Sequence, residues 1–141
     1  MAAAVMALSI SSSLLVMTRG FSSLDSARCI SYASQIMQSE LEKMRLTQWG
    51  DGTGGAGSGT TGVSAYPTTR TILPIAASFT NAGDVGSRMI LTRIAADAPG
   101  HTAGMIAVTL QITWTTYDKR SLARSYTTYY GQGGLYDFFS L

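Results

Sequence analysis

The residues most able to do chemistry are one histidine and one cysteine among 141 residues, and they lie far apart in the sequence. His101 follows Pro99 and Gly100, so we expect it in a solvent-facing loop. A catalytic histidine needs an orienting acid and a nucleophile within hydrogen-bond reach. Asp97 is nearby and serines are numerous, but no nucleophile-elbow motif joins them. We therefore predict no acid–base or nucleophilic site at this loop.

Metal and carboxylate chemistry is not indicated either. A metal site needs clustered histidine, cysteine or carboxylate ligands, whereas the eight acidic residues are dispersed along the chain. Cys29 has no second cysteine with which to form an intramolecular disulfide, and we expect it to be a small packing residue within a helix. The sequence predicts no enzyme, no cofactor and no metal.

A glycine-rich segment contains a formal nucleotide-binding pattern. Seven glycines lie among the thirteen residues 50–62, and Gly52, Gly54 and Gly57 form a G-x-G-x-x-G match. In a dinucleotide-binding fold this pattern leaves a strand and opens a helix. Here it leaves a helical segment, enters polar coil and has no P-loop lysine after it. We predict a flexible loop, residues 50–62, that joins a helix to a sheet.

Length and charge restrict the remaining possibilities. A chain of 141 residues has room for one domain. Charged side chains make up 13% of the sequence, and the net charge is +2. Because the ten basic residues are scattered rather than gathered on one face, we expect no nucleic acid partner.

The first eighteen residues carry no charge and contain no proline. A helix of this length reaches the lower limit for spanning a bilayer, and its serine and threonine hydroxyls can bond to carbonyls of the preceding turn. Three interpretations remain open: a membrane or filament-core helix, a cleaved secretory signal, or a buried helix of a soluble domain. We favour the first because no basic segment precedes the apolar one and no clear cleavage site ends it. The candidate embedding residues are Ala3, Ala4, Val5, Leu8, Ile10, Leu14, Leu15, Val16 and Met17.

Residues 19–49 continue the helix as an amphipathic stretch. Gly20 marks the change and predicts a bend or local loosening, while Trp49 and Gly50 predict the helix end. Apolar side chains return at steps of three and four on one side of the helix. They are Ala27, Ile30, Ala33, Met37, Leu41 and Met44.

Residues 63–141 predict a small antiparallel β-domain. Residues 70–76 read as an edge strand because of Pro74, 88–95 as a second strand, and 105–115 and 122–130 as a hairpin. We expect the aromatic tail, residues 135–141, to pack against the sheet. The fold class is therefore α+β, a long N-terminal helix packed on this sheet. The predicted helix–sheet core is Ile30, Met37, Leu41, Met44, Ile106, Val108, Leu110, Ile112 and Trp114.

This arrangement resembles the type IV pilin and pseudopilin superfamily. Residues 5–10 (VMALSI) resemble the interior of a pilin spine helix, and 35–45 (QIMQSELEKMR) resemble the helix end of minor pilins and pseudopilins. Residues 108–114 (VTLQITW) and 124–130 (RSYTTYY) resemble the final strands of that group. The resemblance covers most of the chain and rests largely on apolar patterns.

One family feature has no counterpart in this sequence. The superfamily carries a short basic leader with a glycine, and a glutamate at the fifth mature position, where this chain has Val5. We expect Met1 to be an internal start within the helix, the alternative being a chain without the leader. Arg19 follows the apolar run and nothing basic precedes it. Taken alone, this charge pattern places the sheet domain in the cytoplasm, against the family expectation.

The resemblance implies a non-catalytic structural subunit, minor rather than major, of a pilus or a type II secretion pseudopilus. Its implied partners are other pilin-like subunits contacted through the N-terminal helix, the lipid bilayer before assembly, and an assembly machinery. Its implied location is the bacterial inner membrane, with a periplasmic or extracellular sheet domain. The rival interpretation is a membrane-anchored binding module that does not polymerise.

Overall fold

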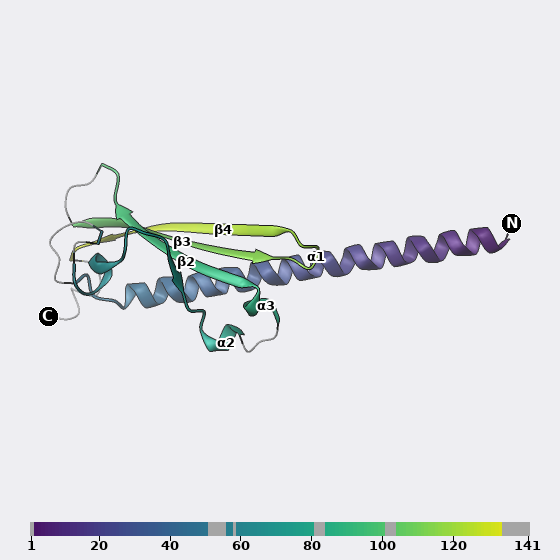
Figure 1. Cartoon of the computed structure of the whole chain (residues 1–141), viewed down its shortest axis with the longest axis horizontal. Helices are drawn as coiled ribbons and strands as arrows, with labels where there is room; N and C mark the ends of the chain where they lie inside the picture. Colours follow the sequence, from purple (N-terminus) through teal and green to yellow (C-terminus); the bar gives the residue numbers. More distant parts are fainter. Residues whose placement is uncertain (1, 51–55, 58, 81–83, 101–103, 134–141) are drawn as a thin grey trace.

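The computed structural model describes residues 2–50, 56–57, 59–80, 84–100 and 104–133. A single helix, α1 (Ala2–Arg45), forms a rod, and one end of the rod lies along a small sheet domain (Figure 1). The remaining elements are η1 (Val63–Ala65), β1 (Thr71–Leu73), α2 (Ala77–Thr80), α3 (Asp84–Ser87), β2 (Met89–Asp97), β3 (Met105–Thr115) and β4 (Ser121–Gly131).

The four strands form an antiparallel sheet in the order β1-β2-β3-β4. The α+β class, with a long N-terminal helix on a small antiparallel sheet, is thus confirmed. β3 coincides with the predicted strand, and β4 begins and ends one residue outside its prediction. β1 is a short edge strand that stops just before Pro74, as the missing N–H of proline requires.

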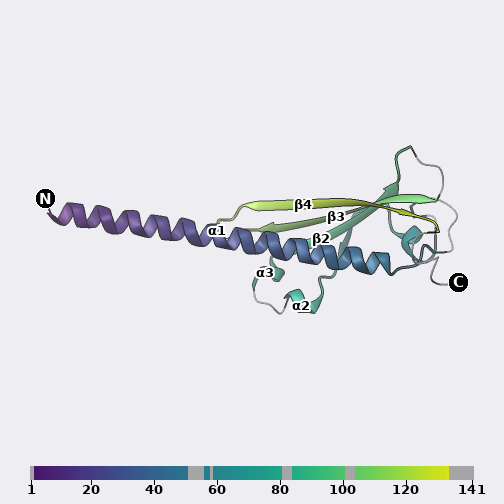
Figure 2. The same ribbon diagram turned by 180° about the vertical axis from the view of Figure 1, so that it is seen from behind.

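Strict alternation along β3 builds the sheet side of the core. Five large apolar side chains of β3 point toward α1 and are almost completely buried, which confirms their prediction. They are Ile106, Val108, Leu110, Ile112 and Trp114. Seen from behind, α1 crosses the same face of the sheet and covers it (Figure 2).

The C-terminal half of α1 supplies the other side of the core. Cys29, Ala33, Ile36 and Met37 pack with residues of β2 and β3 in one cluster, and Met44 belongs to a second cluster. Burial of the single cysteine agrees with its predicted packing role. Small side chains at two of these positions let the helix approach the sheet closely.

The predicted helical face is wrong at Ile30, which is 42% exposed, whereas Ile36 is 2% exposed. The two side chains lie about 60° to either side of Ala33 around a helix of 3.6 residues per turn. The sheet covers the side that carries Ile36, so Ile30 faces outward. The prediction is also wrong at Ala27, which is exposed on the same side as Ile30. Leu41 is half-buried at the margin of the second cluster, and Met37 and Met44 are buried as predicted.

Helix α1 ends at Arg45, four residues before the predicted end at Trp49. The chain leaves the helix so that the indole of Trp49 can enter the second core cluster, where it is 5% exposed. Val63 then donates a backbone hydrogen bond to Gln48 O at 3.0 Å, and Ser64 donates one to Trp49 O at 2.8 Å. The two ends of the glycine-rich loop are therefore tied together, so that the loop returns to where it starts. No interruption of α1 accompanies Gly20.

Several sequence expectations fall outside the described residues. These are the placement of His101, the positions of Gly52 and Gly54, and the packing of the tail 135–141.

Candidate functional site: an uncovered apolar helix and its junction with the sheet

The N-terminal part of α1, residues 2–17, projects beyond the sheet and is exposed along its whole length (Figures 1 and 2). Every predicted embedding residue lies on this projecting rod and is exposed. Leu8 is 73% exposed and Val16 is 69% exposed. The uncovered surface continues past the predicted boundary at Thr18, because Phe21 and Leu24 are also exposed. The rod is apolar on all sides, which is the pattern of a helix meant for an apolar environment.

Four of the five hydroxyl groups between Ala2 and Thr18 donate to carbonyls of the helix itself. Ser9 donates to Val5 O at 2.9 Å, and Ser11 donates to Ala7 O at 2.8 Å. Thr18 donates in the same way to Leu15 O. These bonds confirm the expected back-bonding and lower the penalty of transferring the hydroxyls into an apolar phase.

Among the described residues, α1 is the one helix long and apolar enough to cross a membrane. The uncharged segment from Ala2 to Thr18 is about 26 Å long at 1.5 Å per residue. This is close to the hydrocarbon thickness of a bilayer, about 30 Å. A secretory signal near the N-terminus has the same length and composition.

A buried ion pair holds the helix to the sheet where the two meet. Arg88, just before β2, donates through its guanidinium to Asp25 Oδ1 at 3.0 Å, and both side chains are about four-fifths buried. The backbone N–H of Tyr117 donates to Asp25 Oδ2 at 3.1 Å. The Arg88 hydrogen bond is the main cause that lowers the pKa of the Asp25 carboxyl below its ordinary value, against the opposing effect of burial. Asp25 is therefore ionised wherever the domain is folded near neutrality.

The β3–β4 turn contacts the helix one turn closer to the projecting rod. Ser22 donates a hydrogen bond to Asp118 Oδ2. A hollow of about 340 Å³ lies between the helix and this turn. It is lined by Thr18, Phe21, Ser22, Asp25, Tyr117 and Asp118. The turn is thus fixed at the level where the uncovered part of α1 begins.

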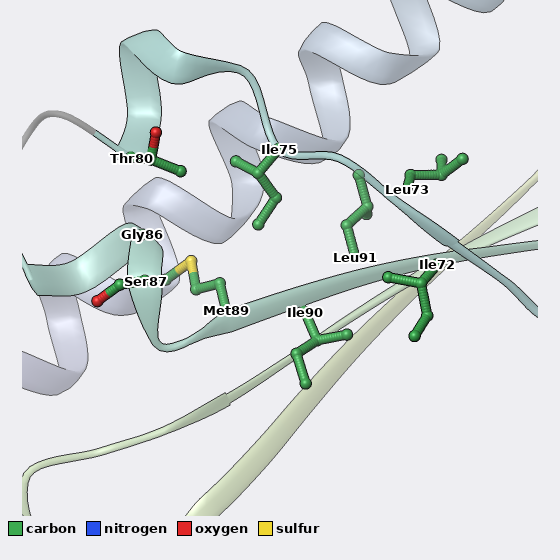
Figure 3. Close-up of a pocket in the computed structure, with 9 residues that line it drawn as sticks. All are labelled: Ile72, Leu73, Ile75, Thr80, Gly86, Ser87, Met89, Ile90 and Leu91. Atoms are coloured by element: carbon green, nitrogen blue, oxygen red, sulfur yellow. The ribbon is translucent and has the colours of Figure 1, made fainter.

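A second hollow, of about 260 Å³, lies beside the edge strand (Figure 3). Side chains of β1, β2 and the α2–α3 segment line it, including Ile75 and Met89, with α1 behind them. Its lining offers apolar atoms and two hydroxyls, and carries no ionisable group. Its described lining residues include no histidine, cysteine, lysine or carboxylate that could activate the Thr80 or Ser87 hydroxyl.

Elsewhere in the described part of the chain, no three histidine, cysteine or acidic residues come together as metal ligands. Burial raises the pKa of the Cys29 thiol, so the thiol stays protonated and a poor nucleophile near neutrality.

Sequence reasoning located the rod and missed the junction. Asp25 is the single acidic residue before Glu40, and a lone carboxylate in so apolar a helix was a signal of a specific partner. Its partners Arg88 and Tyr117 lie 63 and 92 residues away, and no local pattern joins them. The fold alone brings these groups together.

Comparison with protein-family models, curated proteins and solved structures gives no match for this chain.

Proposed function

We propose that this chain is a non-catalytic structural subunit whose apolar helix sits in a bilayer and then in the core of a pilus-like or pseudopilus-like filament. The observation that carries the proposal is the complete lack of cover over the apolar half of α1 within the described chain. The sheet domain completes its own core with the other half of the same helix. The projecting half is therefore surplus to the fold.

Burial of the rod supplies a large driving force for association. Ten large apolar side chains between Val5 and Leu24 are more than half exposed. Full burial of one such side chain contributes about 1.5–3 kcal/mol, so burial of the set contributes on the order of 15 kcal/mol or more. A lipid bilayer or a bundle of identical helices provides this burial, and water does not.

The sequence of the rod also suits packing against copies of itself. In lipid, helices associate through small residues that let backbones approach closely. Ala3, Ala4 and the serines 11–13 provide such positions, and the larger side chains between them fill the spaces. Transfer from bilayer to filament then exchanges lipid contacts for helix–helix contacts.

The second candidate is a membrane-anchored binding module, and the outer face of the sheet favours it. On β2, β3 and β4, the positions that point away from α1 carry no charged side chain. Ile90 and Tyr129 are more than half exposed on this face. Such a face is available to a binding partner in either arrangement, with or without a polymer.

Cysteine crosslinking along the rod tests the proposal. The variants Leu8→Cys and Leu15→Cys are expressed as full chains in bacterial cells, and membranes are oxidised before electrophoresis. Because the native thiol is buried, it does not compete in the folded protein. Leu46→Cys, which is exposed at the far end of the helix, is the matched control.

If the chain forms a filament, Leu8→Cys and Leu15→Cys should give disulfide-linked dimers. Fibres sheared from the cells should then contain the chain. Membrane-bound chains that never crosslink would support the anchored module instead. A chain that keeps its rod and stays in the soluble fraction would contradict both arrangements.

A further inference from the structure

The β3–β4 turn is rigid and lies at the end of the domain nearest the uncovered rod. Lys119 donates its backbone N–H to Thr116 O, and Thr116 donates to Arg120 O, both at 2.9 Å. The Asp25 and Ser22 contacts described above fix this turn against α1. Its side chains are therefore held at a constant level along the helix.

This end of the molecule carries cations without acidic partners. Arg19, Lys119 and Arg120 are exposed, and none of them forms an ion pair within the described chain. Asp25 at this level is paired with Arg88. Asp118 accepts a hydrogen bond from the neutral Ser22 hydroxyl and contributes one formal negative charge, so the three cations and Asp118 together carry a formal charge of +2.

The far end of α1 shows the opposite arrangement. Lys43 pairs with Glu40 and Arg45 pairs with Glu42, so each cation there has a neighbouring acid on the helix. The far end of α1 therefore offers no unpaired helix cation, whereas the three cations named above lie together where the apolar rod emerges. Further exposed arginines without an ion pair among the described residues, such as Arg70 just before β1 and Arg124 on β4, lie between the two ends.

Exposed aromatic side chains occur at the same level. Tyr117 is 81% exposed and Phe21 is 65% exposed, and both line the hollow between turn and helix. Aromatic side chains with a polar tip are favoured where hydrocarbon meets headgroups. Arg19, Phe21 and the β3–β4 turn thus lie at one level, where the uncharged part of the helix ends. In a bilayer that holds the rod, this is the level at which hydrocarbon gives way to interface and headgroups.

We propose that the β3–β4 turn and Arg19 together form a docking surface for the anionic headgroups of the bilayer that holds the rod. This inference rests on the proposed membrane insertion of α1. The surface sets the sheet domain at a defined depth and orientation on the membrane. Each lysine or arginine near an anionic surface raises the equilibrium constant for binding about fivefold. Lys119 and Arg120 together therefore raise the ratio of docked to undocked domains about 30-fold.

Fluorescence quenching in vesicles tests this surface with the full-length chain. One fluorophore is attached to Ser121→Cys beside the turn, and in a separate sample to Val5→Cys on the rod. Quenchers are nitroxides placed in the headgroup region or in the acyl chains. The vesicles contain phosphatidylcholine alone or phosphatidylcholine with phosphatidylglycerol.

Docking predicts strong headgroup quenching at Ser121→Cys in phosphatidylglycerol vesicles and weak quenching in phosphatidylcholine alone. Lys119→Gln with Arg120→Gln should reduce the docked-to-free ratio about 30-fold. About 1 M salt should act similarly, because the Debye length falls to about 3 Å. The matched control, Lys43→Gln with Arg45→Gln at the far end, should leave the quenching unchanged.

Two failures are distinguishable in this design. If Val5→Cys is not quenched from the acyl chains, the rod does not insert and the proposed function itself fails. If Val5→Cys is quenched but the signal at Ser121→Cys does not depend on headgroup charge or on the turn cations, insertion stands and the docking surface is refuted.

Discussion

The two halves of helix α1 have the same backbone geometry and opposite surroundings. From Cys29 to Met44 one face is buried under the sheet, and the other face is polar except for Ile30. From Ala2 to Leu24 the large apolar side chains are exposed, and contact with the rest of the described domain is limited to the β3–β4 turn beside Phe21 and Ser22. One continuous helix therefore joins a segment completed by its own domain to a segment that needs an outside partner.

The difference shows that this short chain uses one half of α1 to fold the sheet domain and leaves the other half free to attach to a partner outside the domain. The sheet domain uses one helical face of about five buried residues to complete its core. The rod contributes no contact to that core, so its composition can follow the requirements of a bilayer or a filament. Substitutions in the rod should change membrane attachment and leave the stability of the sheet domain largely unaffected, and substitutions in the packed half should do the reverse. The following variants test that independence.

The largest expected effect is the loss of membrane attachment when charge enters the rod. Leu8→Arg with Ile10→Arg replaces two exposed apolar side chains near the rod's centre. Placing arginine at the centre of a membrane helix costs about 3 kcal/mol per residue, so the double change costs about 6 kcal/mol. The chain should leave the carbonate-washed membrane pellet while the melting temperature of the sheet domain stays unchanged. Leu46→Arg, equally exposed beyond the sheet end of α1, should alter neither property.

The next largest effect is a difference in stability between variants on the buried and the exposed side of the packed half. Ile36→Ala removes a buried side chain from the core and should lower the free energy of unfolding by about 2–4 kcal/mol. Ile30→Ala removes a largely exposed one and should cost under about 1 kcal/mol. Urea titration of both variants measures the difference. Equal losses would show that the sheet does not select the Ile36 side, and neither variant should change membrane retention.

The contribution of the Asp25–Arg88 ion pair to the free energy of unfolding should depend on pH. Asp25→Asn breaks the ion pair with Arg88 and should lower the free energy of unfolding by about 1–2 kcal/mol at neutral pH. Because folding lowers the pKa of Asp25 below 3.8, its contribution is present above that pH and is lost as the pH falls through the folded-state value. The gap between wild type and variant, measured by urea titration, should therefore close in acid.

A gap that persists in acid would indicate that the loss arises from packing rather than from charge. Glu42→Gln serves as the control, because its ion pair with Arg45 is exposed on both sides. Exposed pairs contribute about 0–1 kcal/mol, so little change is expected.

The smallest expected change in stability comes from exchanging glycine and alanine in the two halves of α1. Gly20→Ala adds a methyl group that meets nothing within 4 Å. It should stabilise the helix locally by about 0.5–1 kcal/mol, seen as slower amide hydrogen exchange around that position and no change in global unfolding. Ala27→Gly, exposed on the packed half, should instead lower the global free energy of unfolding by a similar amount. If both substitutions changed the global free energy of unfolding by the same amount, the helix around Gly20 would unfold together with the sheet domain, against this expectation.

The sequence predicted those parts of the fold that depend on local pattern. Alternation from Met105 to Thr115 determines both the bounds of β3 and its buried face. Pro74 identifies the edge strand because it cannot donate a ladder hydrogen bond. The lack of charge before Arg19 identifies the uncovered rod.

The features that depend on distant residues could not be read from the sequence. Ile30 and Ile36 are equally placed around Ala33, and only the position of the sheet decides which one is buried. Trp49 leaves the helix because a core cluster accepts its indole. Asp25 gains its role from Arg88 and Tyr117, which the fold brings from other elements.

The most direct test of the account is the intact mass of the chain recovered from carbonate-washed membranes of the native cell. We predict a membrane-bound species whose mass includes the rod from Val5 to Leu24, because that segment is the part embedded. A species that begins after Thr18 and is recovered from the soluble fraction would identify the segment as a cleaved signal. That result would contradict both the proposed anchor and the filament.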